Sequence, residues 1–259
     1  QKIRGAGIGL MRGKHAMRIA GIEKCSFVDY PGHLAAVFFT PGCNWNCYYC
    51  HNRGLVDIHA SKPWLDLEVA LAWLDDRTDL IDGVVITGGE PTIQDGLAEF
   101  IECVRRKGFR IKIDTNGSRP DVLGSLLEQG LLDYVAMDIK APMEQYNDFA
   151  GVQVEQDAVN ASMDLLLSSV IDYEFRTTVT PQLTHKDVLA ITRRIRGAKR
   201  YVLQQYRRPA GACDPRLEAP PHPVAWPTDI WSEIRDLVGE CLLRGFETQA
   251  RPDAKALVA

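Results

Sequence analysis

The sequence predicts an α/β fold in which parallel strands alternate with helices and form an open, partial barrel. Three observations support this prediction. Six short β-rich apolar runs recur along the chain, segments of helical periodicity separate them, and polar motifs directly follow several of the runs. Strands that alternate with helices form parallel sheets with right-handed crossovers. Six such units are too few to close an eight-unit barrel, so we expect the barrel to stay open.

The expected strands are the β-rich runs Leu34–Thr40, Gly83–Thr87, Arg110–Asp114, Tyr134–Lys140, Tyr173–Val179 and Arg200–Gln205. Helical periodicity is found at Asp66–Leu74, Gly96–Lys107, Asp121–Gln129, Val159–Ser168 and His185–Ile195. Thr184 and Asp187, three residues apart, form a capping-box pattern at the start of the fifth helix. After a proline-rich stretch, we expect a C-terminal helix over Thr228–Leu243.

At 259 residues, the chain is long enough for one large domain. Residues 1–18 differ in composition from the rest of the chain and are expected to form an N-terminal arm, either a leader or a remnant of expression. Residues 19–259 are expected to form a single domain, with a core at 34–206 and a C-terminal extension at 207–259.

Composition excludes several classes of protein. With 46% apolar and 25% charged residues the chain is an ordinary globular one, and its net charge of −4 gives no reason to expect a nucleic-acid partner. The longest apolar runs are too short to span a bilayer, so no membrane partner is expected. Three of the seven cysteines lie within eight residues, which favours metal binding in a reducing cytoplasm over a disulfide framework.

The clustered cysteines follow directly on the first expected strand, in the string TPGCNWNCYYCHN at Thr40–Asn52. Cys43, Cys47 and Cys50 can surround one metal centre. A structural zinc site needs four ligands, and His51 would have to supply the fourth although it adjoins Cys50. A cubane iron–sulfur cluster held by three thiolates instead leaves one iron open for a ligand. Tyr49 either stacks on a ligand base or packs in the loop.

Later strands also end in polar motifs. The second ends in TGGEP, where Gly88 and Gly89 let the backbone approach a ligand closely and Glu90 can accept a bond from a cationic amine. The third ends in DTNG. Its Asp114, Thr115 and Asn116 form either a turn or a ligand contact.

The fourth and fifth expected strands carry charge. In MDIK, Asp138 and Lys140 lie two residues apart and therefore project to the same face. Arg176, in YEFRTTVTP, is either an inward ligand contact or an exposed charge at a sheet edge.

The cysteine string resembles the C-x-x-x-C-x-φ-C signature of the radical S-adenosylmethionine superfamily, in which φ is aromatic. DYPG at Asp29–Gly32, followed by FFTPGCNWNCYYCHN, is similar to the activating enzymes of glycyl-radical enzymes. Within these it most resembles the anaerobic ribonucleoside-triphosphate reductase activating proteins. The resemblance runs from about Ile19 to Tyr206, and the end of the chain departs from it.

This resemblance implies a [4Fe–4S] cluster on the three cysteines and S-adenosylmethionine as the second cofactor. It implies that the TGGEP turn holds the methionyl amino group and that DTNG lies near the ribose and carboxylate. It further implies that Lys140 pairs with the methionyl carboxylate and that Arg176 points toward the cofactor. Asp114 and Asp138 would help to hold a monovalent cation, although a plain ion pair between Asp138 and Lys140 explains MDIK as well.

The implied activity is reductive cleavage of S-adenosylmethionine to a 5′-deoxyadenosyl radical, which takes a hydrogen atom from a glycine of a partner glycyl-radical enzyme. A flavodoxin or ferredoxin would supply the electron, because the sequence offers only one plausible cluster site. One alternative is an enzyme of the same superfamily that modifies a small molecule, a peptide or RNA. An alternative of another class is an iron–sulfur electron-transfer protein or a structural metal protein.

Overall fold

The computed structural model describes residues 17–58, 64–208, 214–218 and 228–246. Residues 1–16 of the expected N-terminal arm lie outside these ranges, as does part of the expected extension. The chain divides into two compact units. We call Gln1–Asn44, Asn52–Thr115 and Asp121–Val135 the N-terminal unit, and Trp45–His51, Asn116–Pro120 and Ala136–Ala259 the C-terminal unit.

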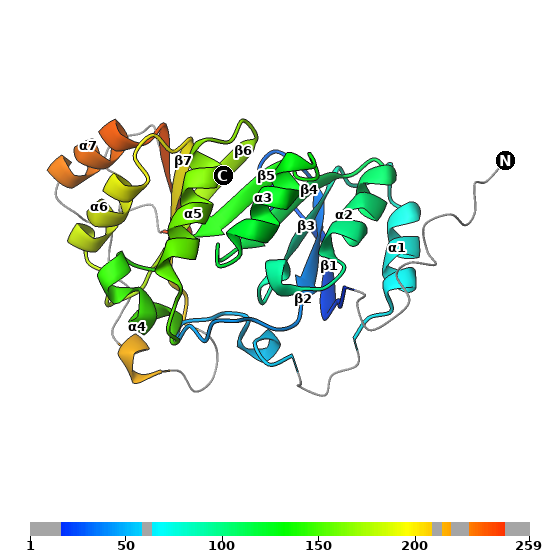
Figure 1. Ribbon diagram of the computed structural model, residues 1–259, viewed down its shortest axis with the longest axis horizontal. Helices are drawn as coiled ribbons and strands as arrows, with labels where there is room; N and C mark the ends of the chain where they lie inside the picture. Colours follow the sequence, from blue (N-terminus) through cyan, green and yellow to red (C-terminus); the bar gives the residue numbers. More distant parts are fainter. Residues whose placement is uncertain (1–16, 59–63, 209–213, 219–227, 247–259) are drawn as a thin grey trace. The chain divides into compact units, whose positions relative to one another are not determined.

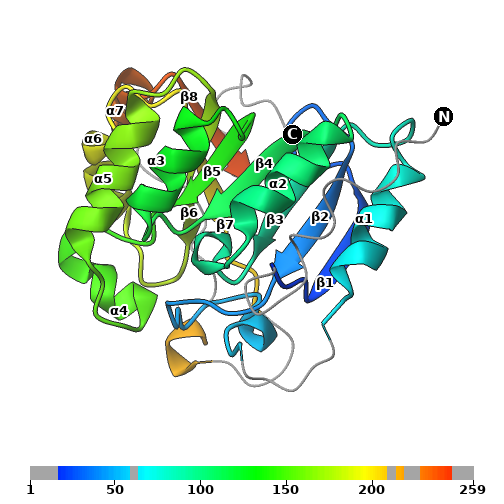
Figure 2. The same ribbon diagram turned by 45° about the vertical axis from the view of Figure 1, so that its right-hand side comes forward.

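The N-terminal unit is built on four strands in the order β1 (Gly21–Ser26), β2 (Ala35–Thr40), β3 (Gly83–Gly88) and β4 (Arg110–Thr115). β1 runs antiparallel to β2, whereas β2, β3 and β4 are parallel. Its helices are α1 (Leu67–Asp75), α2 (Leu97–Arg106) and α3 (Pro120–Glu128), with short 3-10 turns η2 (Arg53–Leu55) and η3 (Pro91–Ile93). Figure 2 shows α1 and α2 lying across one face of these strands.

The apolar pattern of α2 explains how this layer forms. Leu97, Phe100, Ile101 and Val104 recur at helical spacing and are all buried. The ring of Phe100 lies 5.6 Å from that of Phe38 on β2. The helix therefore buries one stripe against the sheet and leaves the strand ends free to carry function.

The C-terminal unit contains β6 (Asp172–Val179), β7 (Arg200–Gln205) and β8 (Glu240–Arg244), which are parallel neighbours in that order. Its helices are α4 (Tyr146–Ala150), α5 (Gln156–Leu167), α6 (His185–Arg194) and α7 (Thr228–Leu237), with 3-10 turns η4 (Met143–Gln145) and η5 (Pro215–Leu217). Figure 1 shows α5 and α6 beside β6 and β7. β5 (Tyr134–Asp138) carries the chain from one unit into the other.

The six predicted strands and the first five predicted helices are all found, most of them within two residues of their expected ends. The α/β class with parallel strands is therefore confirmed. The capping box is present as well, because Thr184 and Asp187 exchange side-chain and backbone hydrogen bonds at the start of α6. The short β1, which pairs antiparallel with β2, was not expected from the sequence.

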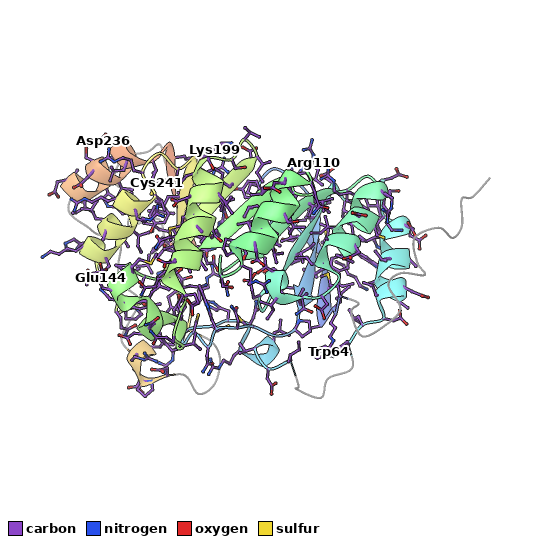
Figure 3. The ribbon with its side chains drawn as sticks, viewed as in Figure 1. Trp64, Arg110, Glu144, Lys199, Asp236 and Cys241 are labelled. Carbon is purple, nitrogen blue, oxygen red and sulfur yellow. The ribbon has the colours of Figure 1, made fainter. Side chains whose placement is uncertain are left out.

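The prediction of one helix over Thr228–Leu243 is wrong in its second half. α7 ends at Leu237, Gly239 donates its N–H to the carbonyl of Ala198 (2.8 Å), and the chain then continues as β8. β8 pairs with β7, and Cys241, labelled in Figure 3, is the register partner of Tyr201. A strand edge that offers backbone hydrogen bonds outweighs the local helical pattern. Burial raises the pKa of the Cys241 thiol to about 12, which fits a small packed residue.

Within the described ranges, no helix is long and apolar enough to cross a bilayer.

The capping box gives a test of local stability in the C-terminal unit. Thr184→Ala removes the side-chain oxygen that accepts from the Asp187 N–H, so we expect the free energy of unfolding to fall by about 1 kcal/mol. Thr78→Ala, at an exposed turn position, should change it by less than about 0.5 kcal/mol. Urea unfolding followed by circular dichroism measures both, and equal effects would show that the cap contributes nothing.

Candidate functional site

The cysteine loop begins where β2 ends and is hydrogen-bonded to the turn that follows β3. Thr40 and Gly88 are register partners at the ends of the two parallel strands. Beyond them, Gly89 donates its N–H to the carbonyl of Thr40, and Glu90 donates to that of Gly42, each at 2.9 Å. The two motifs predicted from the sequence are thus joined by backbone hydrogen bonds, and Cys43 directly follows the joint.

Close approach at this joint requires the glycines. A Cβ on Gly89 would lie 1.9 Å from the carbonyl oxygen of Gly42, which no side chain can occupy. Gly88 has a φ of +117°, and a Cβ there would lie 2.4 Å from the backbone nitrogen of Thr40. The two glycines therefore serve the contact between the loops, as well as any contact with a ligand.

Two side-chain amides that were not predicted from the sequence donate hydrogen bonds to the backbone at the same joint. Asn52 donates from its side chain to the carbonyl of Gly88 (2.9 Å), and Gln94 donates to the carbonyl of Pro41 (2.5 Å). Asn52 closes the cysteine string, and Gln94 lies just after the TGGEP turn. Their place next to the motifs is the only signal that could have drawn attention to them.

Glu90 is held in one orientation within the N-terminal unit. Its side chain is buried, and its Oε1 accepts from the Thr92 N–H (3.0 Å), the Thr92 hydroxyl (2.5 Å) and the Thr115 hydroxyl (2.7 Å). Three donors on one oxygen fix the orientation of the carboxylate. The predicted site residues Glu90 and Thr115 thus contact each other directly.

Asp114 has a partner of its own. The Lys112 ammonium, on a side chain only 2% exposed, is hydrogen-bonded to the Asp114 carboxylate. Two residues apart on β4, the pair shares one face of the strand. The expectation that Asp114 and Asp138 hold a monovalent cation stays a prediction.

Cys47 and Cys50 lie together in the C-terminal unit, where the Cys50 N–H donates to the Cys47 carbonyl (3.2 Å). Burial raises the pKa of the Cys47 thiol, whereas the nearby Lys140 ammonium acts to lower it. None of the cysteines in the described ranges is in a disulfide. The loop thus carries three cysteines outside any disulfide, Cys43 in the N-terminal unit and Cys47 and Cys50 in the C-terminal unit.

Tyr49 is buried among aromatic rings. Its ring meets Tyr48 at 5.0 Å and Phe149 at 6.2 Å, both edge-on. Its hydroxyl is buried and has no hydrogen-bond partner among the described residues. Buried hydroxyls are normally satisfied, so this atom suits a site that a bound group completes. Edge-on packing accounts for the ring itself, and stacking on a ligand base stays a prediction.

Asp138 joins the two basic residues predicted for the site. Its Oδ2 accepts from Lys140 Nζ (2.9 Å) and its Oδ1 accepts from Arg176 Nε (2.8 Å). The Arg176 side chain is only 11% exposed, which contradicts the interpretation of an exposed edge charge. The ion pair between Asp138 and Lys140 that the sequence suggested is present.

The pKa values of Asp138 and Lys140 are both shifted by their neighbours. Burial alone would raise the pKa of Asp138, but Arg176 and Lys140 bring it well below its usual range. Burial alone would lower the pKa of Lys140, yet Asp138, Tyr49 and Cys47 raise it well above its usual value. All three groups are therefore charged at neutral pH, and together they carry one net positive charge.

The DTNG string is divided between the units after Thr115. In the C-terminal unit, Asn116 accepts from the Ser118 N–H through its side-chain oxygen (2.9 Å), and Gly117 accepts from the Ser162 hydroxyl (2.7 Å). The turn interpretation of Asn116 is therefore correct for this part. A contact of the string with the cofactor stays a prediction.

His51 does not behave as a metal ligand. Its Nε2 lies 2.9 Å from the carbonyl oxygen of Arg207, a hydrogen bond that uses the atom a zinc ion would need. Among the described residues, no three histidine, cysteine, aspartate or glutamate side chains gather as a ready-made metal site. The hydrogen bond of His51 argues against its part in a four-ligand zinc centre. That the three cysteines hold a cluster with one open iron stays a prediction.

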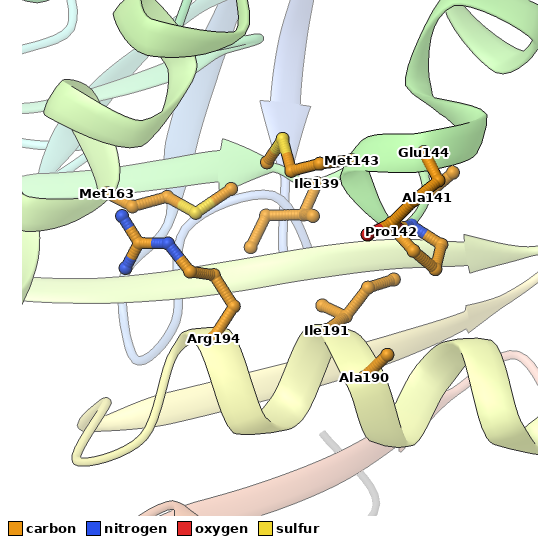
Figure 4. Close-up of a pocket in the computed structure, with 9 residues that line it drawn as sticks. All are labelled: Ile139, Ala141, Pro142, Met143, Glu144, Met163, Ala190, Ile191 and Arg194. Carbon is orange, nitrogen blue, oxygen red and sulfur yellow. The ribbon is translucent and has the colours of Figure 1, made fainter.

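A cavity of about 210 Å³ in the C-terminal unit lies apart from these residues (Figure 4). It is lined by Ile139, Met143, Met163, Ile191 and other mostly apolar side chains. Ile139 points into it, so Asp138 and Lys140, its neighbours on either side, project to the opposite face. The charged site residues and this cavity are therefore on different faces of the same strand end.

Comparison with known proteins identifies relatives over most of the chain. The sequence profile of the Radical SAM superfamily matches residues 37–195. A Methanocaldococcus jannaschii protein, provisionally named a glycyl-radical enzyme activating enzyme, is 33% identical over 225 residues, which make up 85% of this chain and 89% of that protein.

Two further relatives are more partial. The 7-carboxy-7-deazaguanine synthase of Methanopyrus kandleri is 35% identical over 120 residues, covering 39% of this chain and 47% of the synthase. The crystal structure of Streptococcus suis SuiB bound to S-adenosylmethionine superposes with a TM-score of 0.62 at 13% identity, covering 83% of this chain and 53% of SuiB. The chain spans about half the length of each, and the likeness to SuiB is one of fold.

The close approach of Gly89 to the Gly42 carbonyl can be tested by a substitution that adds one methyl group. Gly89→Ala would place a Cβ against the Gly42 carbonyl, so we expect the free energy of unfolding to fall by about 2 kcal/mol or more. Gly21→Ala is the matched control, because no atom lies within 4 Å of its added Cβ. Urea unfolding midpoints compare the two, and a harmless Gly89→Ala would contradict the close approach.

The charge cluster around Asp138 predicts a dependence on pH. Because its pKa lies below the unfolded value of about 3.9, the ion pairs stabilise the fold above about pH 4 and lose this effect as pH falls toward the folded pKa. Asp138→Asn should destabilise the protein by about 2 kcal/mol at pH 7, since it leaves two cations together. The loss in the free energy of unfolding caused by Asp138→Asn should be smaller at pH 3 than at pH 7.

The control for this test is Asp164→Asn, which removes an exposed carboxylate from a pair with Arg194 and should cost less than about 1 kcal/mol at either pH. Urea unfolding of both variants and the wild type at pH 7 and at pH 3 gives four differences in the free energy of unfolding, one for each variant at each pH. A deficit of Asp138→Asn that is equal at both pH values would contradict the shifted pKa.

Proposed function

Because the chain belongs to the radical S-adenosylmethionine superfamily, we propose that it is an activating enzyme that generates a glycyl radical on a partner enzyme. The main support is the relative named for this activity, which is alike over 85% of this chain. Within this class we propose the anaerobic ribonucleoside-triphosphate reductase as the partner, on the resemblance of the cysteine string and the DYPG that precedes it.

The proposed cofactors are the two that the family implies. Cys43, Cys47 and Cys50 would hold a [4Fe–4S] cluster, and S-adenosylmethionine would bind its open iron. When bound, the reduced cluster supplies one electron to the sulfonium, which yields methionine and a 5′-deoxyadenosyl radical. A flavodoxin or ferredoxin in the reducing cytoplasm would provide that electron.

Residues of this chain would bind and orient the methionyl group. Glu90, fixed by Thr92 and Thr115, offers a carboxylate to the ammonium group. The trio of Asp138, Lys140 and Arg176 has one net positive charge, which suits a carboxylate. Since Asp138 already engages both basic side chains, they would meet a ligand in a set orientation.

No side chain of the site needs to act as a general acid or base in this proposal. The chain would hold the cofactor, keep water away from it and admit a glycine-bearing loop of the partner.

The proposal is tested by anaerobic reconstitution with iron and sulfide, followed by addition of dithionite and S-adenosylmethionine. We expect 5′-deoxyadenosine from the wild type and only background from Cys43→Ala, since the loss of one thiolate removes a cluster ligand. Cys25→Ala, at an exposed thiol outside the loop, should retain the activity.

The partner is then tested separately. Addition of an anaerobic ribonucleotide reductase should give a glycyl-radical signal in electron paramagnetic resonance. If S-adenosylmethionine is cleaved without this signal, and a small molecule, peptide or RNA is converted instead, another reaction of the superfamily is favoured. Small molecules are the first class to try, because the chain is similar to the deazaguanine synthase. A four-iron cluster that forms without cleavage would point to electron transfer instead.

A further inference from the structure

Tyr48 stands between Cys47 and Tyr49 in the cysteine loop, and its side chain is held from the end of β6. Its hydroxyl donates to Gln182 Oε1 (3.2 Å) and lies 3.3 Å from the hydroxyl of Thr180. The superfamily pattern leaves this position unspecified, and nothing in the proposed chemistry uses it.

The open face of the Tyr48 ring is covered by Arg216, which lies at the 3-10 turn η5. The Arg216 guanidinium carbon is 3.9 Å from the ring centroid, the geometry of a cation–π stack. Asp214 fixes the guanidinium through two bonds of 2.8 Å, one to Nε and one to Nη2. The stacked arginine is therefore oriented by its own neighbour.

Gln182 closes the arrangement into a ring of contacts. It accepts from the Tyr48 hydroxyl and donates from its amide to the carbonyl of Arg216. Loss of any one member would therefore loosen the other two, because each holds a neighbour in place.

The same part of the chain holds the far end of the cysteine loop. His51 is hydrogen-bonded to the carbonyl of Arg207, two residues after β7 ends. Residues from the segment that follows β7 thus contact the loop at Tyr48 and at His51, on either side of Cys50. All these residues belong to the C-terminal unit.

We propose that Arg207 and Asp214–Leu217 act as a strap on the cysteine loop, and that Arg216 and Tyr48 are its positioning residues. The strap holds Cys47 and Cys50 in fixed places and limits access of solvent to Cys47, which is 9% exposed. That the thiols then bind a cluster rests on the proposed function, whereas the strap itself does not.

The test uses the protein without its cluster, reduced and free of oxygen. Alkylation by N-ethylmaleimide is followed over time, and peptide mass spectrometry assigns the rate at each cysteine. Arg216→Gln removes the stacked cation, so we expect Cys47 to react about tenfold faster than in the wild type. Tyr48→Phe keeps the ring but loses both hydroxyl contacts, and should give a smaller increase.

The matched control is Arg77→Gln, which removes a similar stack of a guanidinium over Trp73, at 4.2 Å, in the N-terminal unit. It should leave the Cys47 rate unchanged. Cys241 on β8 is half-buried, reports a general loosening of the unit and should react at the same rate in every variant. Unchanged Cys47 rates in both Arg216→Gln and Tyr48→Phe, or a parallel rise at Cys241, would overturn the proposal.

A second measurement concerns the reconstituted protein. Arg216→Gln should release iron to a chelator several-fold faster than Arg77→Gln, because the loop that carries two ligands opens more often. Arg216→Lys restores the charge without the planar stack and should fall between the two. If the wild type takes up no cluster, the proposed function fails, while the alkylation rates still decide whether the strap exists.

Discussion

The backbone joint between the cysteine loop and the turn after β3 is the constraint on which the N-terminal half of the site depends. Thr40 and Gly88 end their parallel strands at the same level, so the residues beyond them meet. Because Gly89 has no Cβ, the Gly42 carbonyl can reach the Glu90 N–H. This single contact sets where Cys43 leaves the sheet and where the Glu90 carboxylate points.

In the C-terminal unit, the arrangement of the candidate site residues depends on one charged side chain, that of Asp138. Asp138 accepts from Lys140 and Arg176 at once, which keeps two basic side chains close together with a net charge of only +1. Without the carboxylate, the two cations would repel and turn toward solvent. Burial raises the pKa of the Cys47 thiol, and the same Lys140 lies near this thiol and acts to lower that pKa. One aspartate thus holds two basic side chains together, and one of these lies near the Cys47 thiol.

The segment after β7 adds a second layer of support to the cysteine loop. By its proline and arginine content alone it could be a divergent tail, and its sequence departs from the family that the core resembles. Arg216 on the Tyr48 ring and Arg207 at His51 connect it to the cysteine loop. A region that diverges in sequence can still support the chemistry of the core, because the contacts use a ring face and a backbone carbonyl.

The sequence by itself determined the alternation of strands and helices, the capping box at Thr184 and the three-thiol loop, because each depends on residues a few positions apart. Tertiary structure decided the rest. β8 replaced the end of a helix since β7 offered it a strand edge, and Arg176 became a buried partner of Asp138 across 38 residues. Tyr48 and Arg216 lie 168 residues apart in the sequence and come into contact only in the folded chain. No local pattern encodes such pairs, because their energy arises from burial and charge contacts that exist only once the chain has brought distant segments together.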